Sequence, residues 1–334
     1  MFNIIVDKEY EFLFESLRAE NPGSFSLTLA DISNSDSKLN ELLHKANAII
    51  GQVNLSDVQY KTAANLRIIQ TLSAGFDRID LEKASRNNVL VANNNGANAV
   101  SVAEHVLMLI FALYRRLIFH HQSVASGQWK NLKHSNREFS GKKLGIFGLG
   151  HVGKALAQRA SALGAKVQYF DILRQPEAEK KWNLTFLFPD ELLSSSDIIS
   201  YHVPKTSFTR NLINHASISK MQPGALLINS SRGDVQDENA IVEALNSGKI
   251  FGAGLDVFEV EPLPKNSPLC KLNNVVLTPH SSPDRECYFR TVKHAMDNLQ
   301  KVSKGIQPLA IAVDHEERTR KFLDCFPQVK LTTQ

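Results

Sequence analysis

Residues 143–153 read KLGIFGLGHVG, and this stretch decides the fold. Its first five residues form an apolar strand pattern, and the remainder matches G-x-G-x-x-G. A helical segment rich in Ala and Leu follows at 154–163, and the next strand pattern, Lys166–Phe170, leads into Asp171. Strand, glycine turn, helix and a later acidic residue together predict a βαβ unit that binds a dinucleotide.

Each residue of this motif suits dinucleotide binding for a chemical reason. Gly148 allows a tight turn, Gly150 lets the backbone approach a pyrophosphate, and Gly153 lets helix and strand pack closely, while the helix N-terminus favours the phosphate charge. Asp171 would accept hydrogen bonds from the adenosine ribose and repel a 2′-phosphate, so NAD is predicted over NADP, although Arg174 lies nearby. S-adenosylmethionine, which shares the glycine turn and the acidic strand end, stays open as another cofactor. The predicted cofactor contacts of this unit are Gly148, Gly150, His151, Val152, Gly153 and Asp171.

Strand and helix patterns alternate along the rest of the chain as well. Apolar runs such as 4–6 and 48–50 are separated by helical segments, and a second series begins at Lys143. This alternation predicts an α/β protein with two doubly wound parallel-sheet domains. The last residues form too short a tail to fold alone, so we expect them to join the N-terminal segment. The predicted domains are a dinucleotide-binding domain at 98–289 and a substrate domain made of 1–97 and 290–334.

The composition excludes several classes of protein. The chain has 334 residues, a net charge of +4 without a basic stripe, and 43% hydrophobic residues, so nucleic acid is not an expected partner. The most apolar run, 106–114, is far shorter than the ~20 residues that span a bilayer. The start of the chain lacks a signal-peptide pattern, and the three cysteines lack metal-ligand spacing. We therefore expect a cytoplasmic protein with neither a membrane span nor a metal site.

Three polar side chains follow strands of the predicted dinucleotide-binding domain. Arg232, Glu261 and His280 each lie a few residues beyond one of its last three strand patterns. Because the carboxyl ends of parallel strands share one rim, these side chains can converge. A guanidinium can bind a carboxylate through two hydrogen bonds, and an imidazolium oriented by a carboxylate can donate a proton to a developing alkoxide. Taken singly, each residue is more typical of a surface loop, but the joint pattern favours hydride transfer to a keto acid.

Several motifs follow one another in the order typical of one enzyme family. They are Ser73-Ala74-Gly75-Phe76-Asp77-Arg78-Ile79-Asp80, Asn98-Ala99-Val100-Ser101-Val102-Ala103-Glu104-His105, the glycine turn, His202-Val203-Pro204, residues 229–233, Gly254-Leu255-Asp256-Val257-Phe258 and Thr278-Pro279-His280. On these motifs the chain resembles the D-isomer-specific 2-hydroxyacid dehydrogenases over nearly its whole length. The resemblance implies a Rossmann NAD domain inserted into a discontinuous, flavodoxin-like substrate domain.

The resemblance also implies roles for individual residues. Arg232 would bind the substrate carboxylate and carbonyl, His280 would be the acid/base, and Glu261 its partner. Backbone amides of Ser73-Ala74-Gly75 would help to hold the substrate carboxylate, and the glycine allows this close approach; a plain turn after a strand is the alternative. The remaining implied cofactor contacts are Val203, Pro204, Thr209, Ser230, Ser231 and Asp256. The reaction would exchange hydride between NAD(H) and a small D-2-hydroxy acid or its 2-keto acid.

Departures from the family pattern narrow the range of reactions that the chain is expected to catalyse. Ser281-Ser282-Pro283 follows His280 where many relatives carry a small residue and Gly, which would reshape the edge of the pocket. Ala74 stands where phosphite-oxidising relatives carry Lys, and Glu261 is acidic where formate-oxidising relatives are not, so both reactions are disfavoured. We also expect no regulatory extension beyond residue 334, in contrast to multi-domain phosphoglycerate enzymes.

Assembly and substrate stay open at this point. An apolar helix expected at 100–117 would carry a homodimer interface, and a loop with Trp129 and Lys130 is expected on the surface, with a partner's active site as the alternative location. Glyoxylate, hydroxypyruvate, pyruvate and phenylpyruvate all suit a small, moderately polar pocket. The same family contains NAD-sensing corepressors, so a binding protein is the second hypothesis, although the chain lacks long disordered tails.

Overall fold

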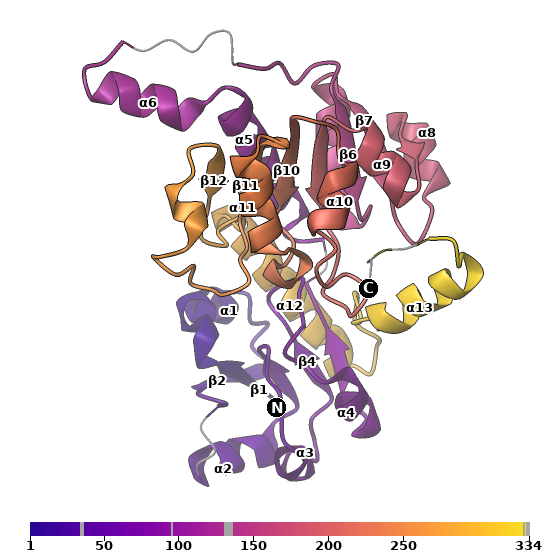
Figure 1. Ribbon diagram of the computed structural model, residues 1–334. Helices are drawn as coiled ribbons and strands as arrows, with labels where there is room; N and C mark the ends of the chain where they lie inside the picture. The colour runs from indigo at the N-terminus through magenta and orange to yellow at the C-terminus, as the bar shows by residue number, and fades with distance from the viewer. Residues whose placement is uncertain (34–36, 95, 130–135, 330, 332–334) are drawn as a thin grey trace. The chain divides into compact units, whose positions relative to one another are not determined.

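The computed structural model describes residues 1–33, 37–94, 96–129, 136–329 and 331. The chain divides into two compact units, here called unit 1 (Met1–Asn98 with Pro283–Asp314) and unit 2 (Ala99–Ser282 with His315–Gln334). Figure 1 labels the elements of both units. Lys130 lies outside the described residues.

Unit 1 is built on a parallel sheet that has five strands within the described residues, in the order β2-β1-β3-β4-β5. This is the order of flavodoxin-like doubly wound sheets, and it agrees with the predicted fold class. Its strands are β1 (Phe2–Asp7), β2 (Phe25–Ala30), β3 (Ala48–Ile50), β4 (Ile68–Gln70) and β5 (Leu90–Ala92). Its helices are η1 (Lys8–Leu13), α1 (Phe14–Ala19), α2 (Ser37–Lys45), α3 (Asp57–Thr62), α4 (Leu81–Arg86) and α12 (Arg285–Ser303).

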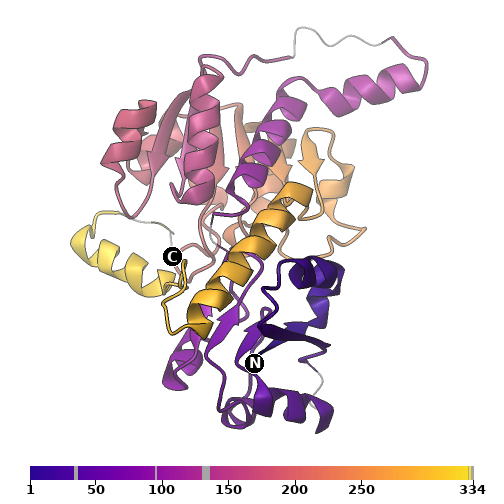
Figure 2. The ribbon, with the colours of Figure 1, turned by 180° about the vertical axis from the view of Figure 1, so that it is seen from behind.

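The long helix α12, best seen in Figure 2, belongs entirely to unit 1. Asp284 caps its start by accepting a hydrogen bond from the Cys287 N–H at 2.6 Å. Its apolar face, which includes Val292 and Leu299, is buried against the strands of unit 1. The domain boundary predicted at residue 290 therefore differs from the structure, because burial of this face keeps the whole helix in one unit.

Unit 2 contains a second parallel sheet, with seven strands within the described residues, in the order β12-β11-β10-β9-β6-β7-β8. Its first six positions counted from β8 follow the order of a dinucleotide-binding doubly wound sheet, in which the order reverses beside β6. Its strands are β6 (Lys143–Phe147), β7 (Lys166–Phe170), β8 (Thr185–Phe186), β9 (Ile198–Tyr201), β10 (Ala225–Asn229), β11 (Ile250–Leu255) and β12 (Val275–Leu277). Its helices are α5 (Ala99–Tyr114), α6 (Leu117–Ala125), α7 (His151–Ala162), α8 (Pro176–Trp182), α9 (Pro189–Ser195), α10 (His215–Lys220), η3 (Gly233–Val235), α11 (Glu238–Asn246), η4 (Pro268–Lys271) and α13 (His315–Cys325).

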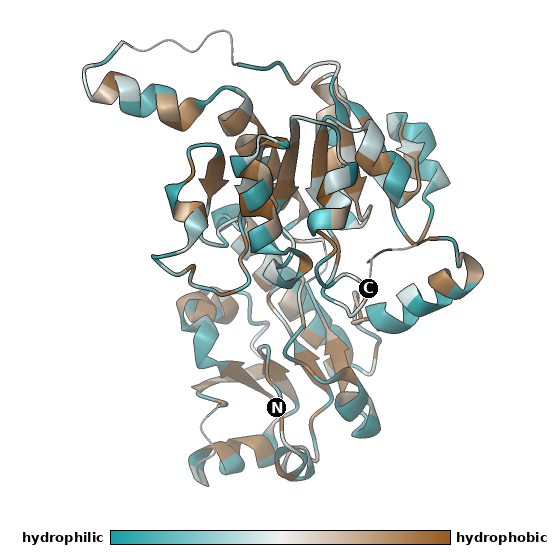
Figure 3. Ribbon diagram, viewed as in Figure 1, coloured by the Kyte–Doolittle hydropathy of each residue, from teal (hydrophilic) through white to brown (hydrophobic). Residues whose placement is uncertain are grey.

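Helices cover both faces of the unit 2 sheet, and the strands are apolar for that reason. On one face α5 and α7 pack against side chains such as Leu144 and Ile146. On the other face α9, α10 and α11 pack against Phe147, Ile199 and Leu227. Figure 3 shows the resulting brown strands between helices that carry teal residues on their outer sides. This sandwich fixes the strand ends that carry the candidate site.

The apolar helix predicted at 100–117 corresponds to α5, which ends three residues earlier, and a separate helix, α6, follows it. α5 ends at Tyr114 and α6 begins at Leu117, because Arg116 takes a left-handed backbone conformation with φ of 48°. α5 has 16 residues. Among the described residues, no helix combines the length and the apolar character needed to cross a membrane.

The C-terminal helix α13 belongs to unit 2, whereas the sequence analysis grouped it with the N-terminal segment. Phe322 and Leu323 of α13 pack against an apolar cluster of unit 2, and Val329 beyond it is buried in that cluster. The pattern of α13 is only weakly apolar, so the sequence did not indicate which unit it would cover.

Candidate active site

The candidate catalytic pair is His280 with Glu261, both in unit 2. His280 Nδ1 lies 2.9 Å from Glu261 Oε2, and the side chains are 48% and 38% exposed. Glu261 is itself held, because its Oε1 accepts a hydrogen bond from the Phe258 N–H at 3.0 Å. Within the described residues His280 Nε2 has no hydrogen-bond partner, so this nitrogen is available to a substrate. The pairing that the sequence suggested is thus present in the geometry.

Arg232 follows β10 in a loop that a buried amide network holds in place. Asn229 Nδ2 donates to the Arg232 carbonyl oxygen at 3.0 Å and to Gln236 Oε1 at 2.8 Å. Gln236 Nε2 in turn donates to the Val257 carbonyl oxygen at 3.0 Å. The guanidinium donates through Nη1 to the Ser231 carbonyl oxygen at 2.7 Å. The network connects the arginine loop to the segment that leads to Glu261.

Gly233 brings the same two segments into direct contact. A Cβ at this position would lie 1.8 Å from the Phe258 carbonyl oxygen, a distance that no side chain can have. The N–H of the same Phe258 is the donor to Glu261. Arg232 and the His280–Glu261 pair are therefore linked through one backbone contact, and glycine is required there.

Asp256, at the end of β11, organises the loop that carries His280. Its Oδ1 accepts hydrogen bonds from Thr278 Oγ1 at 2.6 Å and from the Ser281 N–H at 3.0 Å, and it lies 3.3 Å from His105 Nε2. Its Oδ2 accepts from the N–H and the hydroxyl of Ser282. Asp256 is fully buried. The structure surrounds this carboxylate with donors from the protein, and the cofactor contact that the resemblance implied for Asp256 stays a prediction.

Burial would raise the pKa of Asp256, but hydrogen bonds from His105, Ser282, Thr278 and the Ser281 N–H outweigh it and hold the pKa at about 2. The sequence analysis did not single out His105 or Thr278 for this role. The available signal was a histidine within the largely apolar segment 99–114.

Replacing Asp256 by Asn should destabilise the protein by roughly 2 kcal/mol at pH 7, because a carboxyl with a depressed pKa favours the folded state when ionised. This contribution is complete above the unfolded-state pKa near 4 and disappears as the pH falls through about 2. Urea unfolding of both proteins between pH 7 and pH 2.5 measures the difference. A gap that stays constant down to the lowest pH would contradict the assignment.

The glycine turn has the geometry expected of a phosphate-binding turn. Gly148 has φ of 90°, and a Cβ there would lie 2.4 Å from the His202 carbonyl oxygen. A Cβ on Gly153 would lie 2.2 Å from the Gly148 carbonyl oxygen, so helix and strand pack too closely for a side chain. Gly150 faces open space, and no side chain caps the N-terminus of α7 at this residue. The free N–H groups of His151 and Val152 at this helix start suit an anion.

Asp171 follows β7 beside this turn. Its Oδ2 accepts a hydrogen bond from the Leu149 N–H at 2.6 Å, and its Oδ1 accepts from the Leu173 N–H at 2.9 Å. Burial raises the pKa of this carboxyl, while the two N–H groups and the charges of Lys154 and His315 oppose the rise. Arg174 points its guanidinium at Glu179, with Nε 2.9 Å from Oε1, so it is engaged elsewhere.

The other predicted cofactor contacts lie on two loops of unit 2. Val203 and Pro204 follow β9, and Thr209 holds their loop through a hydrogen bond from its hydroxyl to the Pro204 carbonyl oxygen at 2.6 Å. Ser230 and Ser231 follow β10. Ser231 donates from its N–H and hydroxyl to Asn229, whereas Ser230 Oγ is buried without a partner within the described residues. A buried hydroxyl without a protein partner, such as that of Ser230, is consistent with a hydrogen bond to a polar ligand.

In unit 1 the loop Ser73-Ala74-Gly75 follows β4. Its carbonyl oxygens are held, for example by the Thr71 hydroxyl at 2.7 Å and by Asn93 Nδ2 at 2.7 Å. Gln52 Nε2 donates to Ser73 Oγ at 2.9 Å. Within the described residues the three backbone N–H groups of this loop have no acceptor. These three N–H groups could therefore donate hydrogen bonds to an anionic ligand.

Comparisons with known proteins agree with this geometry. The family model for the NAD-binding domain of D-isomer specific 2-hydroxyacid dehydrogenases matches residues 107–282. A glyoxylate reductase from Thermofilum pendens is 42% identical over 255 residues, which are 75% of each chain.

The chain belongs to the D-isomer-specific 2-hydroxyacid dehydrogenases. It is an NAD-dependent oxidoreductase of this family, as the sequence motifs indicated. A hydroxypyruvate reductase from Thermotoga maritima is 41% identical over 219 residues, covering 65% of this chain and 70% of that protein. The crystal structure of a D-lactate dehydrogenase from Aquifex aeolicus with NAD and lactic acid superposes with a TM-score of 0.77 at 29% identity, over 91% of this chain and 96% of that one.

Proposed function

We propose that this dehydrogenase reduces a small 2-keto acid to the D-2-hydroxy acid, with His280, Glu261 and Arg232 at the reacting centre. The observation that carries the proposal is the hydrogen-bonded pair His280–Glu261, 2.9 Å apart and open on one side, linked to the Arg232 loop. The relatives named glyoxylate and hydroxypyruvate reductases support a short, polar keto acid as substrate. The domain that contains the glycine turn would be the NAD domain, and unit 1 the substrate domain.

Each residue has a defined task in this proposal. Arg232 binds the substrate carboxylate through its planar fork and polarises the neighbouring carbonyl. His280 donates a proton from Nε2 to the carbonyl oxygen as negative charge develops there, and Glu261 fixes the ring through Nδ1. The N–H groups of Ser73-Ala74-Gly75 hold the same carboxylate. Bound NADH supplies the hydride.

The residues present fit a dinucleotide. Gly150 leaves room for the pyrophosphate against the start of α7. Asp171, whose carboxylate accepts a hydrogen bond from the Leu149 N–H of the turn, would bind the adenosine ribose hydroxyls. Ser230 Oγ has no protein partner within the described residues. The acidic Asp171 disfavours a 2′-phosphate, so we propose NADH over NADPH.

The test is a panel of 2-keto acids with NADH and, separately, with NADPH, read as loss of absorbance of the reduced cofactor. We expect rapid oxidation of NADH with glyoxylate or hydroxypyruvate and slow oxidation of NADPH. If NADH binds but no keto acid is reduced, the proposal fails, and a binding protein similar to the NAD-sensing corepressors becomes the better hypothesis.

We also propose that the chain forms a homodimer through α5 and α6. These helices expose six large apolar side chains, namely Val100, Met108, Phe111, Leu117, Ile118 and Val124. Trp129, beyond α6, is 87% exposed. A second copy of the chain would bury these side chains by symmetry.

Light scattering should give a mass about twice the 37.2 kDa of one chain. Replacing Leu117, which is 59% exposed, by Glu should shift the particle toward one chain, because a charge would then be desolvated at the interface. The matched control is Val58→Glu on α3 of unit 1, a similarly exposed apolar residue. A wild-type mass of one chain would refute the dimer.

A further inference from the structure

The C-terminal segment 315–329 packs on unit 2 beside several of the predicted cofactor contacts. It comprises α13 and the four residues after it, shown in yellow in Figure 1. Nothing in the family motifs of this chain refers to it. Its contacts are therefore independent of the catalytic assignment.

One anchor of the segment is polar. Glu316 Oε2 accepts a hydrogen bond from the Ser207 N–H at 2.8 Å, and Oε1 accepts from the Ser207 hydroxyl. Ser207 lies in the loop after β9, between Pro204 and Thr209. A carboxylate that accepts two hydrogen bonds is a strong and directional contact. The start of α13 is thereby fixed to one of the two loops predicted to contact the cofactor.

The second anchor is aromatic. Phe322 packs edge-on against Phe170 with ring centroids 5.9 Å apart, and Phe170 is the last residue of β7. Phe326 stacks on Phe322 at 4.9 Å and lies 6.4 Å from Phe188. Ring contacts of this kind add to the burial of apolar area. The segment is thereby fixed beside the residue that precedes Asp171.

The first residue of α13 also acts on Asp171 directly. His315 lies close enough for its charge to lower the pKa of the Asp171 carboxyl, against the effect of burial. Asp171, the carboxylate proposed to bind the ribose, therefore interacts both with the glycine turn and with the first residue of α13. This places a residue from the C-terminal segment next to the position proposed for the ribose.

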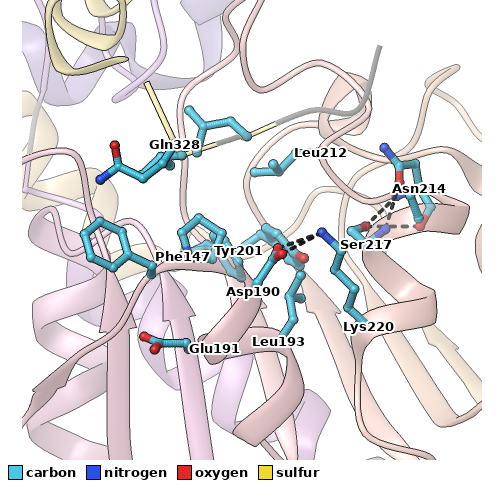
Figure 4. Close-up of a pocket in the computed structure, with 15 residues that line it drawn as sticks. Phe147, Asp190, Glu191, Leu193, Tyr201, Leu212, Asn214, Ser217, Lys220 and Gln328 are labelled. Atoms are coloured by element: carbon cyan, nitrogen blue, oxygen red, sulfur yellow. Dashed lines mark hydrogen bonds and ion pairs between the residues drawn. The ribbon is translucent and has the colours of Figure 1, made fainter. Parts of the chain in front are cut away.

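A cavity of about 330 Å³ lies under the end of the segment, shown in Figure 4. Gln328 and Val329 line it from the segment, and Phe147 and Tyr201 line it from the sheet. The rings of Phe147 and Tyr201 are stacked at 4.7 Å and present apolar surface. Its volume is in the range of small-molecule sites, ~300–1,000 Å³. Residues of α9 and α10 line it as well, and it offers room for a flat ring next to the segment.

We propose that the segment 315–329 is a wall of the adenosine end of the NAD site, and that Glu316 positions this wall and so sets the affinity for the adenosine half of the cofactor. The inference rests on the proposed function, since it requires the cofactor to lie on unit 2. The wall would affect only the adenosine half of the cofactor. Binding of the nicotinamide half and the chemistry at His280 would not depend on it.

The experiment measures binding of ADP-ribose by calorimetry to the full-length chain. Glu316→Ala should raise the dissociation constant about tenfold, because the wall loses its hydrogen bonds to Ser207. The KM for NADH should rise by a similar factor, while kcat at saturating NADH, the KM for the keto acid and binding of reduced nicotinamide mononucleotide stay unchanged. A role in stability alone would not separate the two halves of the cofactor in this way.

The matched control is Glu317→Ala on the exposed side of α13, where Glu317 pairs with Lys321. It should bind ADP-ribose like the wild type. Phe322→Ala, checked by thermal unfolding, tests the second anchor and should also weaken ADP-ribose. The proposal is overturned if ADP-ribose binds to Glu316→Ala and Phe322→Ala as tightly as to the wild type, or more tightly. If the wild type binds ADP-ribose but reduces no keto acid, the reaction proposed above fails and the wall is still decided by these variants.

Discussion

Replacing His280 by Ala should lower kcat for keto-acid reduction by about 10²–10⁴-fold while NADH still binds with its normal affinity. The loss follows from the geometry: His280 Nε2 is the open nitrogen of a ring that Glu261 holds through Nδ1 at 2.9 Å. Without the ring, no side chain of the pair can give a proton to the developing alkoxide. Rapid-mixing measurement of NADH oxidation, together with fluorescence titration of NADH, separates the two effects.

The backbone of His280 calls for a second variant as control. With φ of 51°, this position is left-handed, and Ala tolerates that conformation less well than Asn does. His280→Asn should therefore lose activity to the same extent without added backbone strain. Glu261→Gln, which keeps an oxygen acceptor for the ring, should lose less. Normal turnover in His280→Asn would eliminate the histidine as the proton donor.

Replacing Arg232 by Ala should lower kcat/KM for the keto acid by about 10³-fold, equivalent to roughly 4 kcal/mol of transition-state binding. The substitution should leave the loop intact, because Asn229 holds the backbone carbonyl of residue 232 and not its side chain. Steady-state kinetics over a range of keto-acid concentrations measures the loss. Thermal unfolding checks that the fold is retained.

Two comparisons make the arginine assignment specific. Arg232→Lys keeps the charge but not the planar fork, so its activity should lie between those of the wild type and Arg232→Ala. Added guanidinium should restore part of the activity of Arg232→Ala and none of that of His280→Asn. Unchanged kcat/KM in Arg232→Ala would rule the residue out as the carboxylate binder.

Much of unit 2 could be predicted from its sequence. The strands are continuous apolar runs because both faces of the sheet are covered, and such runs stand out in a sequence. The glycine turn is equally local, since the close contacts that require Gly148 and Gly153 lie within the turn or just beyond the adjoining strand. The edge strands were harder to find. β2 mixes Ser26 and Thr28 with apolar residues and is only half-buried, and β8 has two residues.

The contacts within the candidate site could not be predicted from the sequence in the same way. His105, Asp256 and Ser282 lie far apart in the chain and carry no shared periodicity, yet they form one hydrogen-bonded cluster around a buried carboxylate. Gln236, which joins the arginine loop to Val257, looks like an ordinary polar residue at the start of a helical segment. Such pairings depend on which segments the packed sheet brings together.

The sequence by itself determined the two parallel sheets, the dinucleotide turn and the residue types of the proposed reacting centre, because periodicity, glycine and strand-end polarity are local properties of the chain. Only the tertiary structure decided that α12 stays whole in unit 1 and that α13 packs on unit 2. It also decided that Asp256 is enclosed by protein donors. These outcomes depend on burial of apolar faces and on satisfaction of buried polar groups by residues distant in sequence, and no local pattern encodes either.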